Sequence, residues 1–408
     1  MLGITRSFKV SPIRRAFSAF TYPACPAFGA GRSQLQRFIH RDAKPKPPLA
    51  FTFDIDGVLL RGHHPISGVH EVMRILEGEN ELGHSPLPSK IPFIVLTNGG
   101  GTTEEQRASD LTAKLGTHIK TSQVVQAHTV LKPLACEYKD KPILVLGGIG
   151  DSVQQVAERQ VWNFTHFHLA VREHPTLTLK LTESMYNIAV FRQYVQALGA
   201  YQPTSRQDAD FSKTPIHAVV AFHDPRNWFL DTQIACDVLR GVYLDSLIWR
   251  GMQQERGPKP VELIFCNPDL IWGADFPHPR LGQGGFITAF QSVYEAQFGE
   301  RYPFKQYGKP YKATYDFAKS VLLGQLADIE QTNTKVDLPP MCDPFVVDNP
   351  ESDIAGANGA GWKSILVHTG VYDPNSGVPP KHLPTYQASD VGEAVRLALR
   401  QEMDKPPA

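Results

Sequence analysis

Short runs of apolar residues recur along the chain, and each ends in a turn or in polar residues. Seven of these runs are rich in β-forming residues and have the length of strands buried on both faces of a parallel sheet. They cover residues 49–60, 92–101, 142–150, 216–222, 261–269, 343–353 and 364–372. Each predicted strand is therefore expected to lie in the interior of the protein.

Helical patterns follow several of these predicted strands. Residues 103–115 form one such pattern, with Thr103 and Gln106 placed for a capping box at its start. Residues 289–298 and 313–326 have helical spacing as well. Strands that alternate with helices predict an α/β fold with a parallel sheet.

Two carboxylates end the first predicted strand. Asp54 and Asp56 are alternate residues of an extended chain, so their side chains face the same way. Neighbouring carboxylates repel each other unless a cation or a shared proton offsets their charge. The pair suits a nucleophile beside a general acid–base, with Mg²⁺ bound by the oxygens. A solvated strand-to-turn D-x-D is the alternative.

Polar residues also end the second predicted strand, and one later lysine is a further candidate. The Thr97 hydroxyl and the backbone N–H groups of Asn98 and Gly99 could hold a phosphoryl oxygen, although T-N-G is common in loops. Lys309, between a glycine and a proline, could be a fixed positive charge rather than an ordinary solvated lysine.

An acidic cluster ends the strand predicted at 343–353. Asp348 and Asp353 could complete a magnesium shell with Asp54. The alternative is an acidic turn in which Ser352 caps a helix. In open parallel sheets, chemistry lies just past the carboxyl ends of the strands, so the polar residues that end the predicted strands are the candidates to weigh.

The order of the clusters carries more information than any one of them. D-x-D-G at 54–57, T-N at 97–98, G-K-P at 308–310 and D-x-x-x-x-D at 348–353 form a series that resembles the haloacid dehalogenase superfamily. The resemblance covers most of residues 49–400. The stretches ILVLGG, CNPD and GQGG make the chain most similar to the NagD-like class IIA branch, and within it to the mitochondrial cat-eye-syndrome-critical-region group.

This resemblance implies a Rossmann-like core with a parallel sheet and an inserted α/β cap domain. The expected core is residues 47–124 and 270–400, the cap is 125–269, and residues 401–408 form a tail. Two features depart from the branch: Val347 replaces the glycine of its V-G-D motif, and residues 163–213 match nothing expected of the cap. The second stretch contains three histidines, which we interpret as part of a surface insertion: His166, His168 and His174.

The resemblance also implies a role for each residue of the motifs. Asp54 would attack phosphorus, Asp56 would protonate the leaving alcohol and then activate water, and Lys309 would offset negative charge. Dehalogenating relatives lack a carboxylate at the position of Asp56, so its presence favours phosphate ester hydrolysis. Thr97, Asn98 and Gly99 would hold the phosphoryl group.

The implied magnesium ligands are side chains and one backbone group: Asp54, the backbone carbonyl of Asp56, Asp348 and Asp353. Asn267 and Asp269, near the cap–core junction, could contact the substrate or could only shape a turn. A cap that closes over the site favours a small phosphorylated metabolite as substrate. A catalytically idle binding or scaffold protein in mitochondria and a phosphotransferase are the alternatives.

Charge is distributed unevenly along the chain. Residues 1–46 hold nine basic side chains and one acidic, although the formal net charge of the whole chain is zero. This basic N-terminal segment, with apolar residues at helical spacing, predicts a mitochondrial transit peptide and delivery to the matrix. The zero net charge gives no indication of nucleic-acid binding. No run reaches the ~18 apolar residues of a membrane span, and the oligomeric state stays open.

Overall fold

The computed structural model describes residues 49–79, 90–138, 141, 143–149, 152–160, 164–166, 216–240, 260–274, 276, 278–329 and 344–403. The expected transit peptide lies outside this part of the chain, and so do His168 and His174. All seven predicted strands are present, and so are the three predicted helices. The α/β fold class is therefore confirmed.

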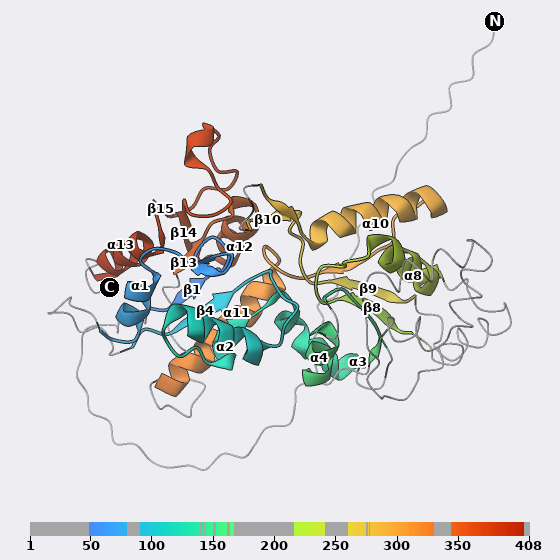
Figure 1. Ribbon diagram of the computed structural model, residues 1–408, viewed down its shortest axis with the longest axis horizontal. Coiled ribbons are helices and arrows are strands. Elements are labelled where there is room, and N and C mark those ends of the chain that lie inside the picture. The colour runs from blue at the N-terminus through green and yellow to red at the C-terminus, as the bar shows by residue number, and fades with distance from the viewer. Residues whose placement is uncertain are drawn as a thin grey trace, which may run out of the picture. The chain divides into compact units, whose positions relative to one another are not determined.

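Six strands form one parallel sheet in the order β15-β14-β13-β1-β4-β5 (Figure 1). Their bounds are β1 Phe51–Phe53, β4 Phe93–Leu96, β5 Val124–Val125, β13 Pro344–Val347, β14 Lys363–Val367 and β15 Tyr386–Ala388. Strand β1 lies between β4 and β13, where the strand order changes direction. In such a sheet, the loops that leave the carboxyl ends of these three strands form the crevice in which ligands bind.

Helices cover both faces of this sheet. Its strands send alternate side chains to opposite faces, as Phe93 and Ile94 of β4 illustrate. One face packs against α1 (Val69–Leu76), α2 (Glu104–Leu115) and α13 (Val391–Met403). The other packs against α11 (Lys312–Ile329) and α12 (Ala355–Ala360). These layers agree with the expected Rossmann-like arrangement.

The start of α2 shows half of the predicted capping box. The Thr103 Oγ1 accepts a hydrogen bond from the backbone N–H of Gln106 at 3.2 Å. The Gln106 side chain donates to Asp110 instead, one turn further along the helix. The single cap fixes the direction in which α2 leaves the loop after β4.

A second parallel sheet has the strand order β12-β9-β8-β6-β7. Its strands are β6 Ile143–Leu146, β7 Phe164–His166, β8 Ala218–Ala221, β9 Glu262–Phe265 and β12 Lys305–Gln306. Helices α3 (Lys132–Tyr138) and α4 (Ser152–Arg159) pack on one face. Helices α8 (Trp228–Arg240) and α10 (Gln283–Phe298) pack on the other. This second layered unit is the cap.

The cap sheet extends beyond residue 269, where the cap was expected to end. Helix α10 buries Phe286, Phe290 and Tyr294 in the apolar cluster that contains Phe265 of β9. Strand β12 then pairs with β9. Residues 283–306 thus pack with the second sheet, although the expected bounds placed them with the core, and the bounds of the two domains stay a prediction.

The remaining elements of the described residues are two hairpins and four short helices. The hairpins are β2 (Leu60–Arg61) with β3 (His64–Pro65), and β10 (Ile271–Trp272) with β11 (Arg280–Leu281). The short helices are η1 (Thr121–Gln123), η2 (Ala127–Leu131), η3 (Pro350–Ile354) and η4 (Pro374–Ser376).

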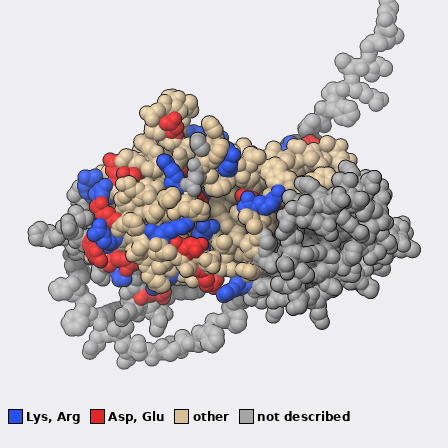
Figure 2. Space-filling model, viewed as in Figure 1, with Lys and Arg blue, Asp and Glu red and all other residues tan. Residues whose placement is uncertain are grey.

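Charged side chains of both signs are interspersed over the described part of the face in Figure 2. Within the described residues, no helix combines the length and the apolar character that crossing a membrane requires.

Candidate active site

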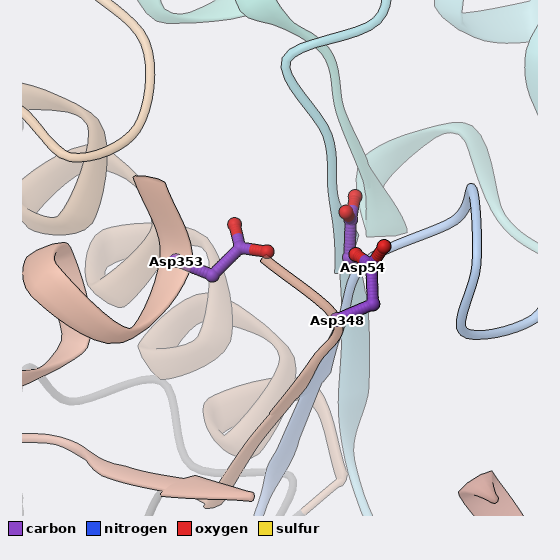
Figure 3. Close-up of side chains that lie close together, drawn as sticks. All are labelled: Asp54, Asp348 and Asp353. Atoms are coloured by element: carbon purple, nitrogen blue, oxygen red, sulfur yellow. The ribbon is translucent and has the colours of Figure 1, made fainter. Parts of the chain in front are cut away.

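Three buried carboxylates meet at the carboxyl edge of the core sheet. Asp54 follows β1 and Asp348 follows the adjacent strand β13, while Asp353 reaches toward them from η3 (Figure 3). One side-chain oxygen from each lies within 4.8 Å of those of the other two. Parallel strands align their carboxyl ends, which explains how residues so distant in sequence come together.

Lys309 lies against two of these carboxylates. Its Nζ is 3.1 Å from Asp54 Oδ1 and 2.6 Å from Asp353 Oδ1, and the residue is only 1% exposed. Burial lowers the pKa of Lys309, but the charges of Asp353 and Asp54 outweigh it and raise the pKa well above its ordinary value. The ammonium group is therefore charged at neutral pH and offsets one of the negative charges.

Thr97, Asn98 and Gly99 begin the loop after β4, which we call the phosphoryl loop (residues 97–101). The Gly99 backbone N–H donates to Thr97 Oγ1 at 2.9 Å. The Asn98 side chain accepts from the Lys309 backbone N–H at 2.7 Å and donates to the Lys309 carbonyl at 3.0 Å. It also donates to Asp269 Oδ2 at 3.0 Å. Asn98 thus fixes the loop to Lys309 and to the segment after β9.

Asn267 and Asp269 lie on the same pocket wall. The Asn267 Oδ1 accepts from the Asp269 backbone N–H at 2.8 Å, and its own backbone N–H donates to Gln283 at 2.9 Å. Burial raises the pKa of Asp269 to about 6, although Lys309 opposes the shift. These bonds show Asn267 shaping a turn, while both side chains stay in the pocket lining.

Asp56 faces the pocket beside the phosphoryl loop. Its Oδ2 lies 3.8 Å from the position that a Cβ on Gly99 would occupy. Burial, followed by the charge of Asp54, raises the pKa of Asp56 to about 6. A carboxyl group in this range can give and take a proton near neutral pH, as an acid–base catalyst must.

The donor set fits a hard divalent cation. Asp54, Asp348 and Asp353 supply buried oxygen ligands, the kind that Mg²⁺ binds. Burial and the charges of Asp54 and Asp353 raise the pKa of Asp348 well above its ordinary value. This repulsion is what a bound cation would relieve.

The loops around Asp348 leave little room. A Cβ on Gly57 would lie 2.5 Å from Asp348 Oδ2, and one on Gly370 would lie 1.9 Å from it. The Val371 backbone N–H donates to the same oxygen at 2.8 Å. Val347, which replaces the glycine of the branch motif, is buried in the apolar cluster between the sheet and α11. The branched side chain therefore points into the core and does not crowd the carboxylates.

A pocket of about 530 Å³ contains nine of the ten predicted site residues. The tenth, Asp353, is in contact with Lys309 behind the pocket wall. Several basic residues of the lining were missed from the sequence: Arg107, Lys114, Arg226 and Arg280. No motif marks them, and only the packing of the cap against the core brings them together.

The chain matches two family models. One, described as haloacid dehalogenase-like hydrolase, covers residues 51–160, and the other, described as HAD-hydrolase-like, covers residues 306–394. The two matched segments contain the residues that surround the pocket from the core sheet.

Two fungal proteins are similar over most of this chain. A mitochondrial hydrolase of Saccharomyces cerevisiae is 33% identical, with 90% of this chain and 99% of the relative covered. A cardiolipin synthase (CMP-forming)/mitochondrial hydrolase fusion protein of Schizosaccharomyces pombe is 34% identical, with 91% of this chain covered. The chain spans only 57% of the length of the fusion protein.

Solved structures share the fold. A hypothetical protein from Pyrococcus horikoshii has a TM-score of 0.54 and 21% identity, with 86% of this chain and 99% of that chain covered. A 4-nitrophenylphosphatase from Thermotoga maritima has a TM-score of 0.52 and 17% identity, with 86% and 97% covered.

Proposed function

Because this chain belongs to the haloacid dehalogenase-like hydrolase family, we propose that it is a magnesium-dependent phosphohydrolase acting on a small phosphorylated metabolite. The observation that carries the proposal is the buried set of Asp54, Asp348, Asp353 and Lys309 at one edge of the core sheet. Asp56, in the same pocket, provides the second carboxylate that phosphate ester hydrolysis needs.

In the first step, Asp54 is the nucleophile. Its Oδ1 accepts a hydrogen bond from the Ile55 backbone N–H and faces Lys309, so Oδ2 is the attacking atom. The Oδ2–phosphorus bond forms as the bond from phosphorus to the leaving oxygen breaks, which gives an aspartyl-phosphate. Asp56 gives its proton to the leaving oxygen, and the alcohol departs.

In the second step, water replaces the alcohol. The Asp56 carboxylate takes a proton from the water, whose oxygen attacks phosphorus and displaces Asp54, and inorganic phosphate leaves. The Thr97 hydroxyl and the backbone N–H groups of the phosphoryl loop hold the phosphoryl oxygens, while Lys309 offsets their charge.

Mg²⁺, when bound, supplies charge neutralisation for the phosphoryl group. Its protein ligands would be the three carboxylates of Asp54, Asp348 and Asp353 with the backbone carbonyl of Asp56.

The Asp54→Asn variant tests this chemistry, because asparagine keeps the side-chain shape but removes the nucleophile. Phosphate release from a panel of small esters should require Mg²⁺ and should fall by about 10³-fold or more in the variant. Asp316→Asn, at an exposed ion pair with Lys312, is the matched control. Release that persists in Asp54→Asn would exclude the mechanism. Stabilisation by Mg²⁺ without any turnover would favour an idle binding protein.

The proposed location is the mitochondrial matrix. The basic residues 1–46 and the mitochondrial names of the two fungal relatives support it. A fluorescent protein fused to residues 1–46 should be imported into mitochondria. A signal that stays protected from added protease in mitoplasts, whose outer membrane has been removed, should place it in the matrix. A fusion that stays in the cytosol would overturn the proposal.

A further inference from the structure

The outer wall of the pocket is basic. Beyond the strand-end clusters, four basic side chains line it: Arg107, Lys114, Arg226 and Arg280. Asp224 is the acidic residue of the same outer lining in the described part of the chain, and burial raises the pKa of its carboxyl. None of the four basic side chains forms an ion pair with a carboxylate among the residues that the structure describes. This wall therefore offers positive charge to a ligand.

One of these arginines lies close to the phosphoryl loop. A Cβ on Gly101 would lie 2.4 Å from the His223 ring, so this loop of the core packs directly on the loop after β8 of the cap. The His223 Nε2 lies 3.2 Å from Arg226 Nη2. A single imidazole ring thus separates the Arg226 guanidinium from the loop beside Asp56.

The contact with His223 occupies only part of the Arg226 guanidinium. Burial, followed by the charge of Arg226, lowers the pKa of His223 to about 3, so the ring is neutral and its Nε2 can accept the hydrogen bond. The Arg226 side chain is exposed to the pocket, and its planar guanidinium carries further N–H donors. These donors have the fork geometry that matches a carboxylate or a phosphate.

Two of the other basic residues already have structural contacts. Arg107 donates to the Gln126 side chain at 3.3 Å and to the Gly100 carbonyl at 3.4 Å, which fixes the phosphoryl loop. Arg280 lies over the Phe276 ring at 4.0 Å and donates to the His278 carbonyl. Arg226, which is exposed in the pocket lining, is the arginine left to meet the part of a substrate that leaves the phosphoryl site.

We propose that the leaving group of the substrate carries a second anionic group, a carboxylate or a second phosphate, and that Arg226 binds it. This inference rests on the proposed hydrolase function and names the class of ester that the site selects. A charge-assisted, bidentate pair at Arg226 would hold the leaving group in place while Asp54 attacks phosphorus at the other end.

Three esters with the same three-carbon chain test the proposal. They are 3-hydroxypropyl phosphate, 2-carboxyethyl phosphate and 1,3-propanediol bisphosphate, assayed with the full chain and Mg²⁺. In the wild type, kcat/KM should be at least about tenfold higher for an ester with the second anion than for the neutral ester. Arg226→Gln should reduce this ratio toward one, and Arg226→Glu should invert it. Arg301→Gln, at an exposed arginine outside the pocket lining, should preserve it.

The outcomes separate the two proposals. Equal kcat/KM for neutral and anionic esters, or an equal loss for all three in Arg226→Gln, would overturn the role of Arg226 and leave the hydrolase function intact. A preference confined to the carboxylate or to the bisphosphate identifies the anion. If no ester is hydrolysed, the hydrolase function fails, and calorimetric binding of the same three compounds decides the role of Arg226. Tighter binding of an anionic compound that is lost in Arg226→Gln supports it, and equal binding overturns it.

Discussion

The Lys309 ammonium lies 3.1 Å from the Asp54 carboxylate, in a site where both side chains are buried. The lysine also contacts Asp353, so it joins the segment after β1 to η3. A buried charge without its partner is strongly destabilising, so Lys309 should contribute to the stability of the folded state as well as to the proposed chemistry.

Lys309→Met should therefore lower stability as well as activity. Without Mg²⁺, the variant leaves Asp54 and Asp353 without a counterion, and we expect a loss of about 3–5 kcal/mol in the free energy of unfolding. Urea denaturation in EDTA measures it. Lys312→Met removes an exposed pair with Asp316 and should cost about 0–1 kcal/mol. Similar losses in both variants would show that the Lys309 contacts do not stabilise the fold.

Mg²⁺ should raise the unfolding temperature, and Asp348→Asn should abolish most of the rise. Binding at a hundredfold excess over Kd stabilises the folded state by about 2.7 kcal/mol. Differential scanning fluorimetry over a Mg²⁺ titration measures the effect. Asp390→Asn is the control, because asparagine keeps the cap at the start of α13, where Asp390 accepts from the Glu393 N–H. An unchanged response in Asp348→Asn would exclude Asp348 as a ligand.

Gly370→Ala should disturb the carboxylate cluster without touching a charge. The new Cβ would lie 1.9 Å from Asp348 Oδ2, so Asp348 must move. We expect the Mg²⁺ concentration for half-maximal activity to rise by about tenfold or more. Gly324→Ala, in α11 with nothing within 4 Å, should instead stabilise the protein by about 0.5–1 kcal/mol. Normal magnesium dependence in Gly370→Ala would contradict the close packing.

Acid should destabilise the protein through His128. Burial lowers the pKa of His128 to about 4 from its ordinary 6.5, although Glu104 at 3.9 Å opposes the shift. Between these values the unfolded chain binds a proton that the folded chain does not. Stability is thus intact above pH 6.5 and falls by up to about 3 kcal/mol as the pH drops to 4.

His128→Gln isolates this contribution. Urea unfolding of the wild type and the variant, measured from pH 7.5 to 4, should show a shallower loss of stability in the variant. His223, whose pKa is also lowered by burial, should leave a residual slope of the same sign. Parallel curves for the two proteins would show that His128 does not bind its proton differently in the folded and unfolded states.

The strand ends were the part of the site that the sequence could predict. Asp54, Thr97 and Asp348 each follow a buried apolar run, and parallel strands align such ends by geometry alone. Lys309 could be found only through its place in the motif series, because nothing local predicts that a lysine after a two-residue strand is 1% exposed.

The cap side of the pocket could not be predicted in the same way. Arg226 and His223 follow an ordinary strand, β8, and their place beside Gly101 depends on how the cap packs on the core. The packing of residues 283–306 on the second sheet could not be predicted for a related reason. Helix α10 has the spacing of any amphipathic helix, and its apolar side chains do not reveal which of the two sheets they will cover.

The return of the chain from cap to core has a mechanical consequence. Strand β12 ends at Gln306, and the next residue, Tyr307, still donates its N–H to Phe265 of the cap at 2.8 Å. Lys309 follows two residues later and is bonded to Asn98 of the core. A rotation of the cap relative to the core would therefore be transmitted to the ammonium group beside Asp54 through only two residues. Any such movement would also shift the positive charge beside Asp54, so the position of the cap and the charge at the carboxylate cluster are linked.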